Sequence, residues 1–211
     1  YVAIMGESGS GKTTLLNILA ALDQPTDGEV ILNGKKLQSV REKEIAAFRR
    51  KHLGFVFQDF YLLNSLSVKE NIMLPMVLDK APVDKCYKNV EAYAENFGLS
   101  HLLEKQPYEV SGGEKQRVAI CRALINNPDL ILADEPTGNL DSKSGKIVID
   151  ALKDINEHMG KTIIMVTHDP QMASYCSRLI LLKDGVILED LKNSGDQEAF
   201  YQEILEKMKE L

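Results

Sequence analysis

The first residues of the chain have a spacing suited to holding phosphate. Residues 6–13 read Gly-Glu-Ser-Gly-Ser-Gly-Lys-Thr and fit the pattern G-x-x-x-x-G-K-[ST] at each fixed position. Glycines let successive backbone N–H groups turn toward an anion. In such a loop the lysine reaches the β- and γ-phosphates and the threonine hydroxyl ligates Mg²⁺. The sequence therefore predicts a nucleoside triphosphate site made of Gly6, Glu7, Ser8, Gly9, Ser10, Gly11, Lys12, Thr13 and Thr14.

Two adjacent carboxylates, Asp134 and Glu135, follow the apolar run 130–133. Side chains alternate across a strand, so two neighbours at its end are free to do different jobs. Asp134 suits the shell of a Mg²⁺ ion, and Glu135 suits polarising an attacking water. A solvated turn with two acidic residues is the alternative interpretation. The phosphate loop upstream favours the catalytic one.

A second anion-binding helix start is predicted at Ser111-Gly112-Gly113. Serine is a good N-cap, and the glycines leave backbone N–H groups free to face an anion. A single triphosphate held by the loop at Lys12 leaves this second site without a ligand in its own subunit. We therefore expect a head-to-tail homodimer, in which Ser111 of one subunit caps the γ-phosphate bound to the other.

These groups must be positioned by strands that alternate with helices, which is typical of an α/β fold with a mainly parallel sheet. Ligands bind at the carboxyl ends of the strands in such folds. Strands are predicted at 1–5, 29–34, 53–57, 130–133, 162–166, 179–182 and 186–188, and helices at 15–20, 42–50, from 111, and at 144–159. The strand at 29–34 ends in an Asn-Gly turn, and an Asp-Gly turn at 184–185 joins the last two strands into a closing hairpin. Because Tyr1 falls inside a predicted core strand, we expect further residues N-terminal to it.

The pattern changes between residues 59 and 110, where strand-like runs vanish and Pro75, Pro82 and Pro107 interrupt helix formers. We predict an inserted helical subdomain at 59–110, with residues 1–58 and 111–195 forming the α/β core. The segment 196–211 places Phe200, Ile204, Met208 and Leu211 on one helical face. We expect that face either to pack on the domain or to dock to a partner.

Composition limits the function classes. With 211 residues, 44% hydrophobic content and 27% charged content, the chain is typical of a single globular domain. A net charge of -6 argues against nucleic acid as a partner. The three cysteines form no C-x-x-C pair, which favours a reducing compartment. Apolar runs fall short of the roughly 18 residues of a membrane span, so we expect a cytoplasmic protein or one facing the cytoplasm.

Together the motifs resemble those of the nucleotide-binding subunit of an ATP-binding cassette (ABC) transporter. The resemblance covers nearly the whole chain. It rests on the loop at 6–13, Gln58 after a strand, Val-Ser-Gly-Gly-Glu at 110–114, Asp134-Glu135, Gly-Asn-Leu-Asp at 138–141 and Thr-His-Asp at 167–169. It implies that Gln58 contacts Mg²⁺ and the attacking water, that His168 contacts the γ-phosphate, and that Asp141 links the two sites of the dimer.

The sequence departs from the family pattern in two ways. Val110 and Glu114 stand where the common signature has leucine and glutamine, while the anion-facing serine and glycines are intact. The resemblance also implies antiparallel strands upstream of the first strand, and the aromatic residue that stacks on adenine in this family lies there too. The preference for ATP therefore rests on the resemblance.

Finer features at 53–60, 70–75 and 133–141 resemble the MacB/lipoprotein-release branch, and the tail at 200–205 resembles its bacitracin- and lantibiotic-resistance group. This implies a peripheral ATPase on the cytoplasmic face of the membrane. Its partner would be a permease that exports antimicrobial peptides or performs lipoprotein- or macrolide-type efflux, with a sensor kinase possible through the permease. The alternatives are a force-transmitting cell-division ATPase and a soluble ABC ATPase that does not transport.

Overall fold

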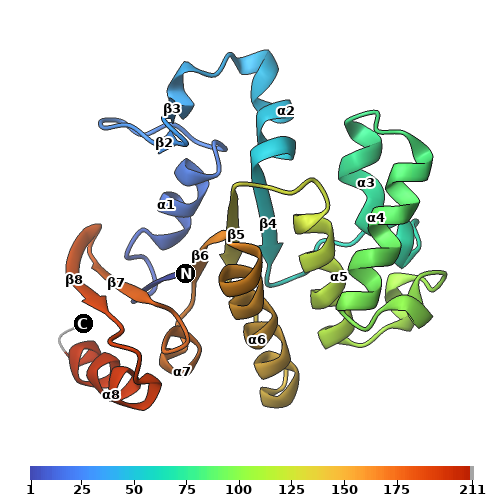
Figure 1. Ribbon diagram of the computed structural model, residues 1–211. Helices are drawn as coiled ribbons and strands as arrows, with labels where there is room; N and C mark the ends of the chain where they lie inside the picture. The colour runs from blue at the N-terminus through green and yellow to red at the C-terminus, as the bar shows by residue number, and fades with distance from the viewer. Residues whose placement is uncertain (210–211) are drawn as a thin grey trace.

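A mixed sheet forms the centre of the computed structural model, which describes residues 1–209 (Figure 1). The strand order is β4-β5-β6-β1-β7-β8, and only β8 runs antiparallel to its neighbour within this described sheet. The strands are β1 (Val2–Gly6), β4 (Leu53–Phe57), β5 (Leu130–Asp134), β6 (Thr162–Val166), β7 (Arg178–Lys183) and β8 (Val186–Lys192). The predicted α/β class with a mainly parallel sheet is confirmed.

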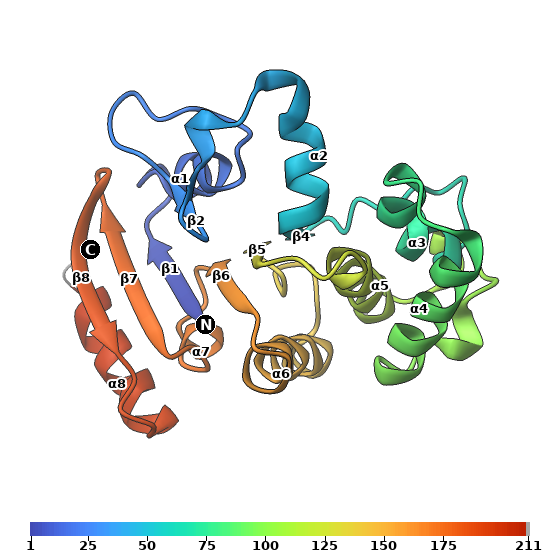
Figure 2. The ribbon, with the colours of Figure 1, turned by 45° about the horizontal axis from the view of Figure 1, so that its top comes forward.

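Helices cover both faces of this sheet (Figure 2). Both faces need covering because successive side chains of a strand point to opposite faces of the sheet. In β1, Ala3 and Met5 pack into one core with residues of α5 and α6, while Ile4 packs with Leu16 of α1 on the other face. The helices are α1 (Lys12–Leu19), α2 (Glu42–His52), α3 (Val68–Leu78), α4 (Val83–Asn96), α5 (Gly112–Leu124), α6 (Ser142–Met159), α7 (Pro170–Ala173) and α8 (Gln197–Met208).

The strand predicted at 29–34 is shorter than expected, and the Asn-Gly turn predicted at its end belongs to a small hairpin. It consists of β2 (Ile31–Leu32) and β3 (Lys35–Lys36), which pair antiparallel in a separate sheet. Asn33 and Gly34 have φ of 49° and 77°, which suits the Asn-Gly turn of a two-residue hairpin. The second strand is short and exposed, so the sequence carries little hydrophobic signal for it.

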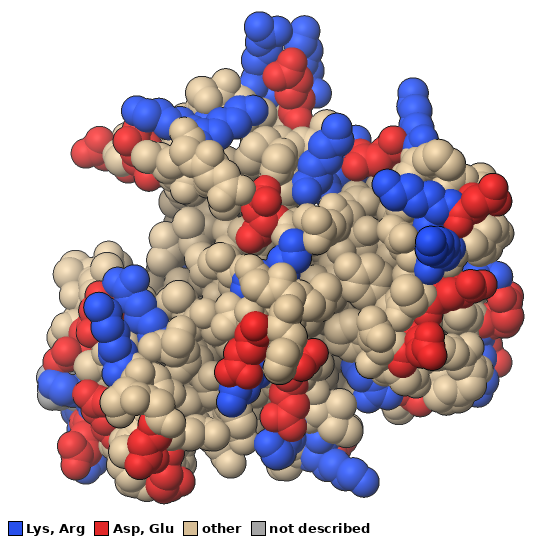
Figure 3. Space-filling view, in the orientation of Figure 1, with Lys and Arg blue, Asp and Glu red and all other residues tan. Residues whose placement is uncertain are grey.

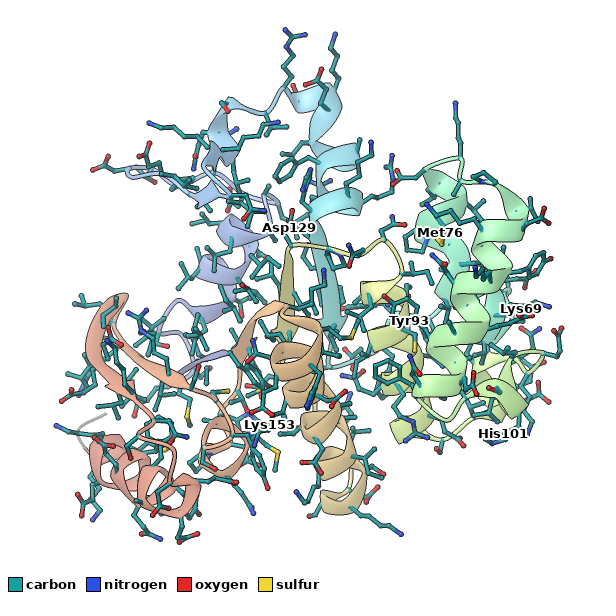
Figure 4. The ribbon with its side chains drawn as sticks, in the orientation of Figure 1. Lys69, Met76, Tyr93, His101, Asp129 and Lys153 are labelled. Atoms are coloured by element: carbon teal, nitrogen blue, oxygen red, sulfur yellow. The ribbon has the colours of Figure 1, made fainter. Side chains whose placement is uncertain are left out.

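Helices α3 and α4 lie beside α5 at one side of the molecule (Figure 1). Buried apolar residues of all three form a second core. Tyr93 lies between α4 and α5 (Figure 4) and donates to the Leu124 carbonyl at 3.4 Å. Pro75 lies inside α3 and does not end it, contrary to the punctuation predicted from sequence. The capping box of Ser67 and Glu70 at the start of α3 helps to hold the helix despite the proline.

The last described helix, α8, packs on the sheet layer through Phe200 and Ile204, which are buried in the main core. Asp196 caps its first turn by accepting from the Ala199 N–H. Leu211, predicted on the same face, lies outside the described residues. Among residues 1–209, no helix combines the length and the apolar character that crossing a bilayer would require.

Candidate functional site

Four parallel strands end at one edge of the sheet and bring the predicted site residues there. Register pairs Phe57 with Asp134 and Asp134 with Val166, and pairs Ile4 with Val166. The residues that directly follow β1, β4, β5 and β6 therefore share this edge. These residues are the loop from Glu7 onward, Gln58, Glu135 and the pair Thr167-His168.

The loop between β1 and α1 requires glycine at two points. A Cβ on Gly6 would overlap the Leu182 carbonyl oxygen of β7. Gly11 has φ of 95° and is the N-cap of α1, without a side-chain cap, so the helix begins directly at Lys12. The Ser10 carbonyl accepts from the Gly185 N–H in the turn between β7 and β8. The closing hairpin formed by β7 and β8 therefore holds the loop in place.

Lys12 folds back over its own loop. Its Nζ donates to the carbonyls of Gly6 at 2.8 Å and Glu7 at 2.6 Å. Residues 7–9 and both threonines, Thr13 and Thr14, are exposed. The segment 7–9 and the amino end of α1 therefore face solvent beside the Lys12 ammonium group, which is an arrangement that favours anions.

Asp134 and Glu135 differ in their surroundings. Asp134 is the last residue of β5, where burial raises the pKa of its carboxyl, the charge of Glu135 raises it further, and Lys12 acts in the opposite direction. Glu135 is past the strand, with φ of 45°, and its N–H donates to the Val166 carbonyl of β6 at 2.9 Å. A left-handed backbone at a bulky residue is unfavourable, so tertiary contacts hold Glu135 in place.

Glu135 is paired with His168. The His168 Nδ1 and the Glu135 Oε1 lie 2.9 Å apart, and the His168 N–H donates to Oε2 at 3.3 Å. The Glu135 side chain is 17% exposed and the His168 side chain is 73% exposed. The carboxylate is therefore held from the protein side, while the imidazole extends into solvent at the sheet edge.

Gln58 is bound to the loop that follows Glu135. Its Nε2 donates to Asn139 Oδ1 at 3.1 Å, and Asn139 Nδ2 donates to the Gln58 carbonyl at 3.2 Å and to Asp59 Oδ1 at 2.8 Å. A Cβ added to Gly138 would come within 2.8 Å of Gln58 Nε2. The loops after β4 and β5 are thus packed together through Gln58.

Ser111 starts α5 as predicted. Its hydroxyl donates to Glu114 Oε2 at 2.7 Å, its N–H donates to the same oxygen at 2.7 Å, and the Glu114 N–H donates to Ser111 Oγ at 3.4 Å. The bonds from Ser111 lower the pKa of Glu114. A Cβ on Gly113 would come within 3.0 Å of Ser144 Oγ, so this glycine lets α5 approach α6 closely.

The structure does not bring all the predicted residues together. Within residues 1–209, no hydrogen bond or ion pair joins Ser111, Gly112 or Gly113 to the loop 6–14. The residue Asp141 caps α6, with its Oδ1 accepting from the Lys143 and Ser144 N–H groups. A single chain therefore presents the phosphate loop and the serine helix as separate surfaces.

Thr13, Asp134 and Gln58 offer the oxygen donors that Mg²⁺ prefers. Across the described chain, no three His, Cys, Asp or Glu residues form a metal cluster. Magnesium is usually held by one or two carboxylates, waters and substrate phosphates rather than by an all-protein cage. The half-buried Asp134 carboxyl, whose pKa is raised, suits a position where a cation would compensate its charge.

Two contributors were absent from the sequence-based site. Asn139 binds Gln58 across 81 positions in the chain, and no local pattern indicates such a pair. Gln116 is buried in α5 and donates to backbone carbonyls next to Gln58 and Glu135. The available signal was a glutamine just before the apolar run 118–121, on a helix expected to pack on the sheet, where a buried amide needs partners.

Comparison with known proteins agrees with this geometry. The family model described as ABC transporter matches residues 1–138. The chain is 47% identical over 206 residues to the bacitracin export ATP-binding protein BceA of Halalkalibacterium halodurans, covering 97% of this chain and 81% of that protein. It is 46% identical over 209 residues to the macrolide export ATP-binding/permease protein MacB of Campylobacter jejuni, covering 99% of this chain and 32% of that longer protein.

Among solved structures, the dimeric post-hydrolysis state of the ATP-binding cassette MJ0796 with ADP and Pi is 42% identical. It covers 93% of this chain and 86% of that chain, with a TM-score of 0.83. These matches confirm the resemblance to the ABC family and to the branch that includes BceA and MacB. The chain therefore belongs to the ABC transporter family, as an ATP-binding subunit with ATPase activity.

Proposed function

We propose that two copies of this chain hydrolyse ATP at composite sites and so power a membrane permease that exports antimicrobial peptides or related substrates. The observation that carries the catalytic part is the contact between Glu135 and His168 at the edge where the phosphate loop also ends. This contact supports a role for Glu135 as the base and for His168 as a phosphate contact, because both lie at the sheet edge from which the exposed loop 7–9 starts.

Binding of ATP falls to the loop 6–14. Lys12 exchanges its bonds to the Gly6 and Glu7 carbonyls for bonds to the β- and γ-phosphates, and the loop amides surround the β-phosphate. Thr13, Asp134 and Gln58 are the residues that would hold Mg²⁺. Such an ion would supply compensation of the negative charge on the phosphate oxygens.

Hydrolysis needs an activated water in line with the γ-phosphate. Glu135 accepts a hydrogen bond from that water and takes its proton as the new P–O bond forms and the bond to the ADP oxygen breaks. His168 contacts the γ-phosphate and, through its contact with Glu135, fixes the carboxylate. The partner subunit's Ser111, Gly112 and Gly113 close the γ-phosphate cage, and Asp141 lies between the two sites.

The transport part rests on similarity to exporters. BceA is named a bacitracin exporter and MacB a macrolide exporter. By this similarity the chain works on the cytoplasmic face of the membrane, bound to a permease that selects the substrate. The resemblance to the peptide-resistance group also supports a sensor kinase as a further partner, which would contact the permease.

The catalytic assignment is tested with Glu135→Gln, because losing a general base typically lowers the rate about 10²–10⁴-fold. We expect this loss together with ATP-dependent dimers in size-exclusion chromatography, since ATP binds but is not cleaved. Glu157→Gln, which changes an exposed carboxylate on α6, is the matched control and should keep the parental rate. Parental hydrolysis by Glu135→Gln contradicts the proposal.

The transport assignment is tested by purifying the protein from membranes of its own cells and identifying what accompanies it by mass spectrometry. A co-purifying permease supports the proposed role, and resistance to bacitracin-type peptides that depends on both proteins supports the substrate class. Recovery of division proteins or ribosomes in place of a permease would overturn it.

A further inference from the structure

Gln116 joins the ends of two strands that carry site residues. Its side chain is buried, and its Nε2 donates to the Phe57 carbonyl at 3.2 Å and to the Pro136 carbonyl at 2.6 Å. Phe57 directly precedes Gln58, and Pro136 directly follows Glu135. One amide group on α5 therefore fixes the backbone beside both of these residues.

These bonds begin where the pairing between the two strands stops. The register of β4 and β5 ends at Phe57 and Asp134, and the next residue, Glu135, has left-handed backbone with φ of 45°. Beyond this point, within residues 1–209, the β4–β5 ladder does not continue, and the two segments are joined instead by the bonds between Gln58, Asp59 and Asn139. Gln116 bridges them from the helix layer, one bond to each.

The other half of the same amide has no partner. Gln116 Oε1 is buried without a hydrogen bond in the described structure. An unpaired buried acceptor is unfavourable for folding, so an apolar side chain of similar length would avoid that penalty. Glutamine at this position is therefore better explained by its two donated bonds, and by the backbone geometry that they impose, than by a contribution to the stability of the fold.

We propose that Gln116 is a positioning residue for ATP hydrolysis, acting through the backbone on Gln58 and Glu135. This inference rests on the proposed roles of those two residues. Because Gln116 stands little more than one helical turn from Ser111, the same rigid helix that faces the partner subunit's nucleotide also sets the spacing of the water-orienting groups in its own subunit.

The test is Gln116→Met in the full chain, since methionine matches the length and removes both the donors and the unpaired oxygen. We expect kcat for ATP hydrolysis to fall about 10–100-fold, the effect of displacing reacting groups by about 1 Å or less. KM for ATP and the melting temperature should stay near parental values, because the phosphate loop and the core are unchanged. Gln202→Met, at an exposed glutamine on α8, controls for the substitution.

A measurement independent of turnover is hydrogen exchange at the two strand ends. The Phe60 and Gly138 N–H groups donate to the Phe57 and Glu135 carbonyls, so they should exchange faster in Gln116→Met, with β6 unaffected. Parental kcat, or parental exchange at both positions, overturns the inference. A drop in kcat accompanied by equal losses of ATP affinity and melting temperature also overturns it, because that result describes general loosening.

Failure of this inference is distinguishable from failure of the proposed catalytic roles. If Glu135→Gln hydrolyses ATP at the parental rate, the assignment of Glu135 fails whatever Gln116→Met does. If Glu135→Gln is inactive and Gln116→Met retains parental kcat, the catalytic assignment stands and Gln116 has no positioning role.

Discussion

The side-chain amides of Gln58 and Asn139 bind each other, and Asn139 also binds the Gln58 backbone. Gln58 Nε2 donates to Asn139 Oδ1, and Asn139 Nδ2 donates back to the Gln58 carbonyl. Gly138 leaves no room for a side chain beneath Gln58. These contacts couple the loops that follow β4 and β5. A displacement of the first loop would therefore reach the residues next to Glu135.

Removing this contact should slow hydrolysis. We predict that Asn139→Ala lowers kcat about tenfold, because Gln58 loses its partner and samples positions away from the reacting water. Steady-state ATP hydrolysis measures the effect. Asn89→Ala, on the distant helix α4, is the control and should match the parent. An Asn139→Ala variant with parental kcat would show that Gln58 is placed without Asn139.

Local sequence signals were enough to predict most elements of the core. Strands β1, β4, β5 and β6 are short apolar runs, and serine's preference for the N-cap predicts Ser111 as the start of α5. The structure adds a capping box between Ser111 and Glu114. The start of α1 was placed three residues late, at Leu15. Its N-cap is Gly11 in a left-handed conformation, which has no side-chain signature. The boundaries of the helical subdomain stay a prediction.

Contacts across the chain were beyond the reach of such signals. The sequence singled out Glu135 and His168 separately, but their pairing depends on β5 and β6 being neighbours in the sheet. Asn139 belongs to the motif at 138–141, but the sequence predicts no role for it, because its partner Gln58 lies in another segment. Strand order and packing, not local propensity, decide these pairs.

The stability of the nucleotide-free protein should rise when the charge of Asp134 is removed. Burial and the charge of Glu135 raise the pKa of this carboxyl in the folded state, so the ionised form is more favourable in the unfolded chain at neutral pH. We predict that Asp134→Asn increases the free energy of unfolding at pH 7.

This gain should shrink as the pH falls through the folded-state pKa toward about 3.9, the ordinary value for Asp. Below that, the parent carboxyl is neutral in both states and resembles the amide. Urea unfolding at several pH values measures the difference, with Asp150→Asn on the surface of α6 as control. A gain that grows with acidity would contradict the argued burial of charge.

Glu114 places a negative charge at the start of the serine helix. Bonds from Ser111 lower the pKa of its carboxyl, so it is ionised at neutral pH and opposes a γ-phosphate held by the same helix end. We predict that Glu114→Gln lowers KM for ATP roughly fivefold, which corresponds to about 1 kcal/mol for two charges near 4 Å in water.

Glutamine also forms capping boxes, so α5 should keep its start in this variant. Glu70→Gln is the matched control, because Glu70 occupies the same place in the Ser67 capping box of α3. It should leave KM unchanged. Equal effects of the two substitutions on KM would mean that the change at position 114 acts through folding and not through phosphate repulsion.

Arg122 holds the strained backbone that follows the Gln58 loop. Phe60 and Tyr61 both have positive φ, 63° and 44°, and the Arg122 guanidinium donates to their carbonyls at 2.6 Å and 2.5 Å. Hydrogen bonds from a charged donor contribute about 1.5–3 kcal/mol. We therefore predict that Arg122→Met lowers the free energy of unfolding by about that amount, measured by urea denaturation.

Arg122→Lys should fall between the parent and the methionine variant, because a single ammonium does not reproduce the fork that spans two adjacent carbonyls. Arg41→Met, at an exposed position before α2, should change stability by less than about 0.5 kcal/mol. If Arg122→Met costs no more than Arg41→Met, the left-handed pair is held by its aromatic packing, in which the rings of Phe57 and Tyr61 meet edge to face at 5.1 Å. Arg122 would then contribute little to holding Phe60 and Tyr61 in the left-handed conformation.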